Sequence, residues 1–170
     1  KINIIPTYID ISSFKPIKTN KEQSRLIVIG RLSKEKNIKS LIKAVKTLDL
    51  VVDIYGEGPL KENLSKLAET VGVKINFMKK VSNSKLPTIL NHYQYYVICS
   101  LAEGTPKTLL EAMACGLVCI GTNVTGINEI LSHKKNGFLA KTTSDKDIKA
   151  ALHEAMSYSD KQAISTQAIR

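Results

Sequence analysis

The sequence predicts a three-layer α/β fold, in which a parallel sheet of about six strands is covered by helices on both faces. Short apolar runs alternate with helical patterns along nearly the whole chain, and this alternation favours a parallel sheet. The chain has 170 residues, 43% of them hydrophobic and 24% charged, which suits one globular domain with a substantial core. Polar motifs follow the ends of several expected strands, where parallel sheets bind ligands.

The expected strands are the apolar runs at residues 26–29, 51–55, 74–78, 96–99 and 118–121, with a short one near 137–139. Helices are expected between and after them, at about residues 34–47, 59–70, 84–92, 106–115 and 144–157. The crossover connections should be right-handed. The loops that directly follow the strands are therefore the first places to look for a site.

The first strand is followed by Gly30, which lets the chain turn, and by Ser33, a predicted helix N-cap. Arg31 and Lys36 should both stand at the carboxyl edge of the sheet, near a helix start. Two cations there could hold a diphosphate, and arginine could bind it through two nitrogens. The alternative is that Arg31 is a salt-bridge partner and Lys36 an ordinary surface lysine.

The second strand is followed by Gly56-Glu57-Gly58, which resembles the opening of a dinucleotide-binding fingerprint. The third glycine of that fingerprint would stand where Lys61 is found, so the pattern fails. This disfavours a nicotinamide dehydrogenase. The two glycines are expected to allow a tight turn and the close approach of a ligand.

The stretch after the fourth strand, residues 103–111, carries the strongest functional signal. Thr105 is a cap-type residue and Pro106 suits the first helical position, so Glu103 should lie in the loop and Glu111 about one turn inside the helix. The unpaired amides from Lys107 to about Leu109 would form an anion site. An acid, a phosphate cradle and a second acid, in this order, suit a sugar, a diphosphate and a ribose.

Glu111 stands among apolar residues and is expected to be buried on its helix. A buried carboxylate costs several kcal/mol unless something satisfies it. Ribose hydroxyls would do so, and so would a structural lysine or arginine, or solvent at an exposed turn. The spacing alone leaves these alternatives open.

The net charge of +10 is carried almost wholly by lysine, because the chain has three arginines. Such charge suits a phosphate-bearing ligand, an anionic membrane or nucleic acid, but the scarcity of arginine and of interleaved aromatic residues argues against nucleic acid. Three cysteines without a C-x-x-C pattern indicate reduced thiols in the core of a cytoplasmic protein. No metal site is expected, and the Asp145-Lys-Asp147 sequence is better explained as a helix start.

Together these pieces resemble the C-terminal, nucleotide-sugar-binding domain of retaining glycosyltransferases of family 4. The resemblance covers nearly the whole chain, and the matching pieces occur in the family's order. They are Ile4-Ile-Pro with Phe14-Lys-Pro16, Gly30-Arg31 with Lys36, Gly56-Glu-Gly-Pro59, Ser100 with Glu103-Gly-Thr-Pro and Leu-Leu-Glu111-Ala-Met-Ala-Cys-Gly116, Gly126 with Glu129-Ile, and Asn136-Gly-Phe-Leu139. The family implies a Rossmann-like domain that forms one half of a GT-B glycosyltransferase.

The resemblance also implies roles for individual residues. Arg31 and Lys36 would bind the donor diphosphate, with Gly30 forming the turn before them, and Glu103 would take the catalytic position beside the donor sugar hydroxyls. Glu111 would hold the ribose hydroxyls. The loop and helix start between the two acids would wrap the sugar and phosphates with backbone amides: Gly104, Thr105, Pro106, Lys107, Thr108 and Leu109. Neither a cofactor nor a metal is implied, and the substrate would be a UDP- or GDP-linked sugar.

The family's domain organisation makes residues 1–20 an extended interdomain linker and residues 21–170 the donor-binding, C-terminal half of a larger enzyme. Its partner would be an N-terminal acceptor domain of the same enzyme, without which this chain is expected to transfer nothing. The implied setting is bacterial surface polysaccharide or glycolipid synthesis, in the cytoplasm, with peripheral contact at the inner face of an anionic plasma membrane.

Two departures from the family pattern affect specificity. Lysines stand at positions 79 and 80, after the third strand, where the family often has glycine beside the nucleobase. Lys107 replaces an apolar residue that many members carry. The alternative functions are another GT-B enzyme, such as a 2-epimerase, and a non-catalytic basic binding module.

Overall fold

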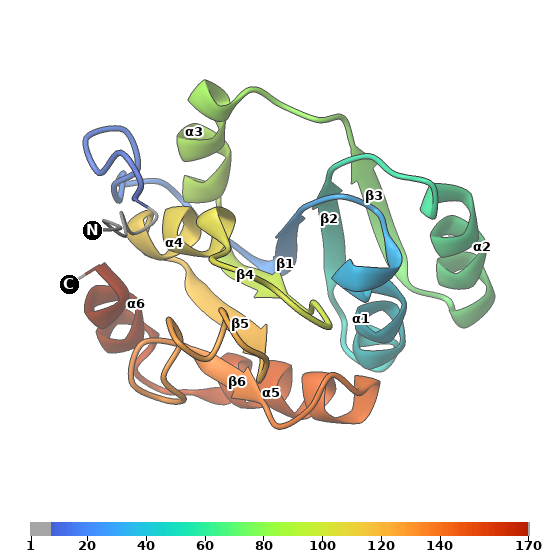
Figure 1. Ribbon diagram of the computed structural model, residues 1–170. Coiled ribbons are helices and arrows are strands. Elements are labelled where there is room, and N and C mark those ends of the chain that lie inside the picture. The colour runs from blue at the N-terminus through green and yellow to red at the C-terminus, as the bar shows by residue number, and fades with distance from the viewer. Residues whose placement is uncertain (1–7, 170) are drawn as a thin grey trace, which may run out of the picture.

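The computed structural model describes residues 8–169 of the chain, without the side chains of 166–169. Its centre is a six-stranded sheet in the order β3-β2-β1-β4-β5-β6, and every neighbouring pair of strands is parallel (Figure 1). The predicted fold class is therefore confirmed. The strands are β1 (Glu22–Ile29), β2 (Val51–Tyr55), β3 (Lys74–Met78), β4 (Tyr93–Ile98), β5 (Val118–Thr122) and β6 (Phe138–Ala140).

Helices cover both faces of the sheet, as Figure 1 shows. On one face lie α1 (Ile38–Val45), α2 (Lys61–Val71) and α5 (Asp145–Ser157), which bury their apolar sides in one core cluster. On the other lie α3 (Leu86–Asn91) and α4 (Lys107–Ala114), which build a second cluster. Helix α6 (Lys161–Ile169) packs beside α4 and β5. Side chains from both clusters thus sandwich the sheet.

The strand order changes direction between β1 and β4. The chain runs outward from β1 to β2 and β3, and then crosses back to place β4 on the other side of β1. In open parallel sheets this reversal leaves a crevice beyond the carboxyl ends of the two central strands. The loops after β1 and β4 contain Arg31, Lys36 and Glu103, so the topology brings the predicted site residues to one edge.

The prediction of one helix at residues 34–47 is wrong in one respect, because the helix is interrupted at Asn37. A short 3-10 turn, η1 (Lys34–Lys36), comes first, and Asn37 then adopts a left-handed conformation with φ of 51° before α1 begins. Asparagine tolerates this conformation better than most residues. Its side-chain amide donates to the carbonyl oxygen of Thr143 at 2.9 Å. Ser33 is the N-cap residue of η1, as predicted, although its side chain makes no capping hydrogen bond.

The helix predicted at residues 84–92 also divides, into the 3-10 turn η2 (Asn83–Lys85) and α3. By contrast, the predicted start of α5 is confirmed, because the Ser144 side chain accepts a hydrogen bond from the Asp147 amide. This supports the structural interpretation of the two aspartates there. The three cysteines are free and buried, as expected.

The segment expected to be an extended linker is folded in its described part. The Asp10 carboxylate accepts hydrogen bonds from the Ser12 amide and from the hydroxyls of Ser12 and Ser13, which closes a turn. Phe14 is buried in the core beneath α3 and α4. The Asn91 side chain then accepts from the Ile17 amide, so this segment is attached to the end of α3. Residues 1–7 lie outside the described part.

A buried carboxylate, Asp53, joins four strands. It is fully buried in the middle of β2, and the Arg25 guanidinium of β1 donates to both of its oxygens, at 2.8 and 2.7 Å. Asn76 of β3 and Tyr93 of β4 donate at 2.8 and 2.7 Å. Burial and the hydrogen bonds around it raise the pKa of Tyr93, which keeps its hydroxyl proton available for Asp53.

Candidate functional site

A large hollow of about 780 Å³ opens between the loops that follow β1, β2 and β3. It is large enough for a nucleotide-sized molecule. Of the predicted site residues, Gly30 and Arg31 line it. The others that line it are Ile29, Tyr55, Gly56, Glu57, Gly58, Lys80, Val81, Asn83 and Leu86. Glu103 and the start of α4 lie outside it, so the predicted residues occupy more than one part of this edge.

Gly56 and Gly58 bring the first two of these loops together. A side chain on Gly56 would come within 1.9 Å of the Gly30 carbonyl oxygen, and one on Gly58 within 2.4 Å of the Leu32 carbonyl oxygen. The Leu32 amide donates to the Glu57 carbonyl at 2.9 Å. These glycines were expected to let a ligand come close. In this structure they instead let the loop after β2 pack closely against the loop after β1. This packing fixes the wall of the hollow that carries Arg31.

Lys36 and Glu103 meet at the reversal of the sheet. Their Nζ and Oε1 atoms are 2.5 Å apart, and the Ser100 hydroxyl donates to the same Oε1 at 2.5 Å. The Lys36 side chain passes over Gly30, where an added Cβ would lie 3.6 Å from its Cε. The ion pair thus lies next to the loop that lines the large hollow.

Two further contacts hold the loop of Lys36 against the loop of Glu103. The Leu101 amide donates to the Glu35 carbonyl at 2.7 Å, and the Cys99 thiol donates to the Lys36 carbonyl at 3.1 Å. Burial raises the pKa of Cys99 to about 12, so this thiol keeps its proton. The two loops are therefore fastened to each other before any ligand arrives.

The start of α4 differs by one residue from the prediction. Pro106, with φ of −73° and ψ of 99°, is the N-cap, and the helix begins at Lys107. The Leu109 amide, predicted to be free, donates to the Pro106 carbonyl at 3.1 Å. Within the described chain, the amides of Lys107 and Thr108 donate to no acceptor. A smaller anion site than predicted, with two free amides, therefore remains at this helix start.

Side chains around this helix start are turned away from it. The Lys107 ammonium lies 6.0 Å from the centre of the Tyr8 ring, and the Thr108 hydroxyl lies 2.8 Å from the Tyr96 hydroxyl in the core. Thr105 is exposed, and an added side chain at Gly104 would meet nothing within 4 Å. The exposed residues Gly104 and Thr105 and the two free amides of the helix start are thus the parts of this loop open to a ligand.

Glu111 lies in the first turns of α4 and is only 4% exposed. Within the described chain, no hydrogen bond or ion pair reaches its carboxylate. Burial raises the pKa of Glu111, and the positive charge of Lys107 opposes this shift. Of the three alternatives left open by the sequence, the structural lysine or arginine partner is thus not found among the described residues.

Gly126, in the loop after β5, was not predicted to be a site residue. It has φ of 81°, and a side chain there would come within 1.8 Å of the Gly104 carbonyl oxygen and 2.8 Å of the Glu103 carbonyl oxygen. The loop after β5 therefore supports the loop that carries Glu103. Its position after a strand was a usable signal, but only the structure shows the contact.

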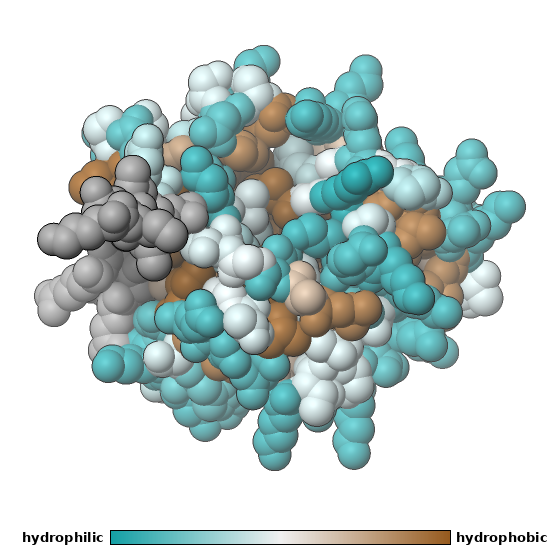
Figure 2. Space-filling view, in the orientation of Figure 1, coloured by the Kyte–Doolittle hydropathy of each residue, from teal (hydrophilic) through white to brown (hydrophobic). Residues whose placement is uncertain are grey.

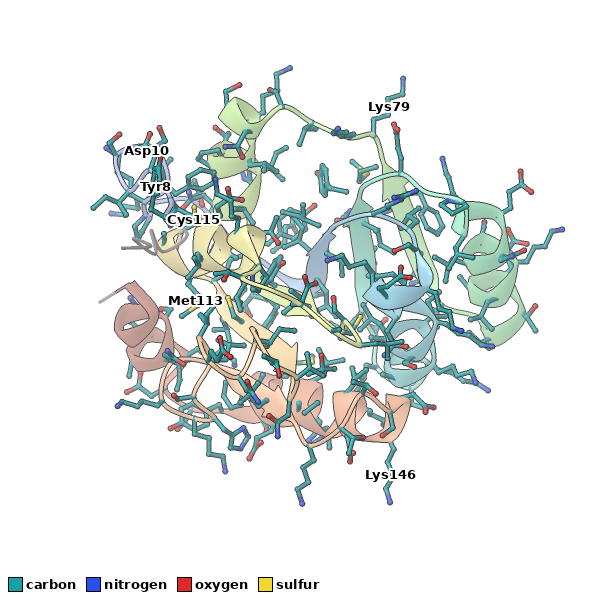
Figure 3. All side chains as sticks on the ribbon, in the orientation of Figure 1. Tyr8, Asp10, Lys79, Met113, Cys115 and Lys146 are labelled. Atoms are coloured by element: carbon teal, nitrogen blue, oxygen red, sulfur yellow. The ribbon has the colours of Figure 1, made fainter. Side chains whose placement is uncertain are left out.

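Lysines dominate the charge of the surface, and hydrophilic side chains cover most of the face in Figure 2. Figure 3 shows Lys79 and Lys146 extending away from the body of the molecule. Among the described residues, no group of three or more His, Cys, Asp or Glu side chains could hold a metal ion. None of the described helices has the length and apolar character needed to cross a membrane.

Most of the chain matches the sequence pattern of one protein family. The family described as "Glycosyl transferases group 1" matches residues 10–170. The chain is 33% identical over 151 residues to the UDP-N-acetylglucosamine–peptide N-acetylglucosaminyltransferase GtfA subunit of Limosilactobacillus reuteri. It is 29% identical over 158 residues to a UDP-Gal:alpha-D-GlcNAc-diphosphoundecaprenol alpha-1,3-galactosyltransferase of Escherichia coli. These matches include 85% and 82% of this chain, but 29% and 41% of those proteins.

Solved structures share the fold over nearly the whole chain. The C-terminal domain of a glycosyl transferase group 1 family protein, LpcC, from Francisella tularensis has a TM-score of 0.82 at 21% identity, covering 95% of both chains. The pneumococcal O-GlcNAc transferase GtfA, in complex with UDP and GlcNAc, has a TM-score of 0.82 at 27% identity. That match covers 92% of this chain and 33% of the other.

Proposed function

Because the chain belongs to the glycosyl transferases group 1 family and has the Rossmann-like fold of a GT-B domain, we propose that it binds the donor of a sugar transfer. The enzyme moves a sugar from a nucleoside diphosphate to an acceptor hydroxyl, with retention of the anomeric configuration, as in family 4. This chain is its C-terminal half. An N-terminal acceptor-binding domain of the same enzyme supplies the other side of the site.

The observation that carries this proposal is the state of Glu111. Glu111 as a whole residue is 4% exposed, and nothing in the described chain donates to its carboxylate, so the carboxylate oxygens are left to solvent or to a ligand. It stands next to two free helix amides, the arrangement that binds phosphate. Ribose hydroxyls donating to Glu111, with a phosphate oxygen at the amides, would satisfy both groups together.

The donor diphosphate fits between the two cationic positions of this edge. Arg31 lines the large hollow, and Lys36 lies beside it on Glu103. These side chains and the positive end of α4 would neutralise the leaving diphosphate, so the proposal requires no metal. Glu103 would bind the donor sugar hydroxyls and stabilise charge at the reacting carbon.

Uridine is the nucleoside we propose. The two relatives described above are named for UDP-linked donors, and the pneumococcal GtfA structure contains UDP. The base would enter the large hollow, whose wall includes Lys80 and Asn83 from the loop after β3. Lysine at this position is where this chain departs from the family pattern, so it is also where its base preference would be set.

The cellular setting is proposed from the relatives and the charge. Surface polysaccharide or glycolipid synthesis in a bacterium fits a donor domain in the cytoplasm, held near the inner face of the membrane by its net charge of +10. The alternative, a basic module that binds polyanions without sugar transfer, predicts that removing an acidic residue leaves binding intact or improves it.

Titration calorimetry of this chain with UDP, GDP and ADP, first without metal and then with magnesium, tests the proposal. We expect UDP to bind in both conditions. Glu111→Ala should lose about 1–3 kcal/mol of binding free energy, because a ribose hydrogen-bond acceptor disappears. Arg31→Ala should weaken binding as well, whereas Lys146→Ala, which changes an exposed lysine outside the site, should not. Unchanged or tighter binding by Glu111→Ala would contradict the proposal.

A further inference from the structure

Ser100 is placed to control the orientation of Glu103. It is the second residue after β4 and 1% exposed, and its hydroxyl donates to Glu103 Oε1 at 2.5 Å. Lys36 donates to the same oxygen. In the described chain Oε2 receives no hydrogen bond. One carboxylate oxygen is therefore held by two donors, and the other stays available to a ligand.

The position of Ser100 is itself fixed by the sheet. Its carbonyl oxygen accepts a hydrogen bond of 2.7 Å from the hydroxyl of Thr122, the last residue of β5. The next amide along the chain, that of Leu101, is bonded to the Glu35 carbonyl. The peptide group between Ser100 and Leu101 is thus held at both its carbonyl oxygen and its amide, and the Ser100 side chain is buried with its hydroxyl on Glu103.

Lys36 cannot fill this role alone. Its side chain is 30% exposed and carries three N–H groups on a flexible stem, so it can turn toward a phosphate when a donor binds. The hydroxyl of Ser100 has one proton, and the geometry gives that proton to Glu103. When Lys36 is drawn toward the diphosphate, Ser100 is the donor that still holds the carboxylate.

We propose that Ser100 is a positioning residue, which sets the Glu103 carboxylate so that Oε2 faces the hydroxyls of the donor sugar. This inference rests on the proposed donor-binding function. Ser100 touches no substrate and acts through Glu103. Its loss should therefore weaken recognition of the sugar and spare recognition of the nucleotide.

The test compares UDP with UDP-N-acetylglucosamine and UDP-galactose, the donors named for the two relatives. Calorimetry gives the affinity ratio of each nucleotide sugar to UDP for this chain and for Ser100→Ala. For the sugar that the chain accepts, we expect the ratio to fall roughly tenfold, with UDP affinity unchanged, since one hydrogen bond to a charged group is lost. Glu103→Gln should lower the same ratio, and Ser100→Ala added to it should lower it little further.

Ser65→Ala is the matched control, because it also removes a serine hydroxyl that bonds a glutamate, Glu69, but on helix α2. Its ratio should equal that of the unchanged chain, and urea unfolding should show all variants folded. Equal weakening of UDP and nucleotide sugar by Ser100→Ala would mean a structural role only, and would overturn the inference. Failure of the unchanged chain to bind UDP would instead overturn the proposed function, and the role of Ser100 with it.

Discussion

Two acidic residues of this molecule are buried as whole residues, but their carboxylates differ in hydrogen bonding. Asp53, in the middle of the sheet, is fully buried and accepts hydrogen bonds from Arg25, Asn76 and Tyr93. Glu111, at the start of α4, is 4% exposed, and nothing in the described chain donates to it. The first acid lies inside the sheet and the second at its ligand-binding edge.

The difference separates a structural acid from a binding acid. A buried charge that is paired with a guanidinium and supplied with further donors is complete within the fold. A buried charge without hydrogen-bond donors costs free energy that no interaction within the fold offsets. Such a cost is tolerated at sites where a ligand supplies the missing donors. Changes at the two acids should therefore have opposite effects on stability.

Replacing Asp53 should produce the largest effect on folding. Asp53→Ala leaves the Arg25 charge without its partner, and the side chains of Asn76 and Tyr93 lose their acceptor. We expect the free energy of unfolding to fall by about 2–4 kcal/mol, because the buried Tyr93 hydroxyl loses its acceptor, whereas Arg25, 34% exposed, can still be hydrated. Urea unfolding followed by circular dichroism measures it. A loss below about 1 kcal/mol would place this pair with ordinary surface salt bridges.

Replacing Tyr93 should have an intermediate effect. Tyr93→Phe keeps the ring, which is 7% exposed, and removes the hydroxyl that donates to Asp53 at 2.7 Å. The expected loss is about 1.5–3 kcal/mol, since the hydrogen bond goes to a charged group. The same urea experiment checks it, with Tyr95→Phe as a control on the same strand. Equal effects of the two changes would argue that Asp53 does not depend on this donor.

The sequence predicted one of these acids and not the other, for a physical reason. Burial of Glu111 follows from its immediate neighbours on a helix, which are apolar and can be identified within one stretch. The partners of Asp53 are 28, 23 and 40 residues away, and become neighbours only when four strands take their order in the sheet. The sequence near each residue does not indicate the order of the strands in the sheet.

The same distinction explains the candidate site. Lys36 and Glu103 could be placed after two strands from the sequence, but their contact across 67 residues needs β1 and β4 to be adjacent. Asn37, at which the predicted helix breaks, donates to the carbonyl oxygen of Thr143, which is 106 residues away. Locally encoded features, such as the start of α5, were predicted correctly. Features made by contacts between distant loops, such as the support that Gly126 gives to the loop of Glu103, were missed.

Glu111→Gln should have the smallest effect on folding, and a sign opposite to that of Asp53→Ala. Burial raises the pKa of Glu111 in the folded protein, so between the unfolded and folded pKa values the folded state binds more protons. The stability of the unchanged chain should therefore fall as the pH rises through that window. Glutamine does not titrate, so the variant lacks this dependence of stability on pH. As the pH rises, the free energy of unfolding of the variant should increase relative to that of the unchanged chain. The increase should stay below about 1 kcal/mol, because the carboxyl group keeps some solvent screening.

Urea unfolding of both proteins at pH 4 and at pH 7 measures this difference, and the increase should be confined to the window above the unfolded pKa of about 4.3. Adding UDP sharpens the comparison, because a ligand that donates to Glu111 should stabilise the unchanged chain and not the glutamine variant to the same extent. Loss of stability in Glu111→Gln at pH 7, of the size expected for Tyr93→Phe, would show that Glu111 has donors of its own. Both carboxylates would then have structural roles, and the proposal that Glu111 binds the ligand would be wrong.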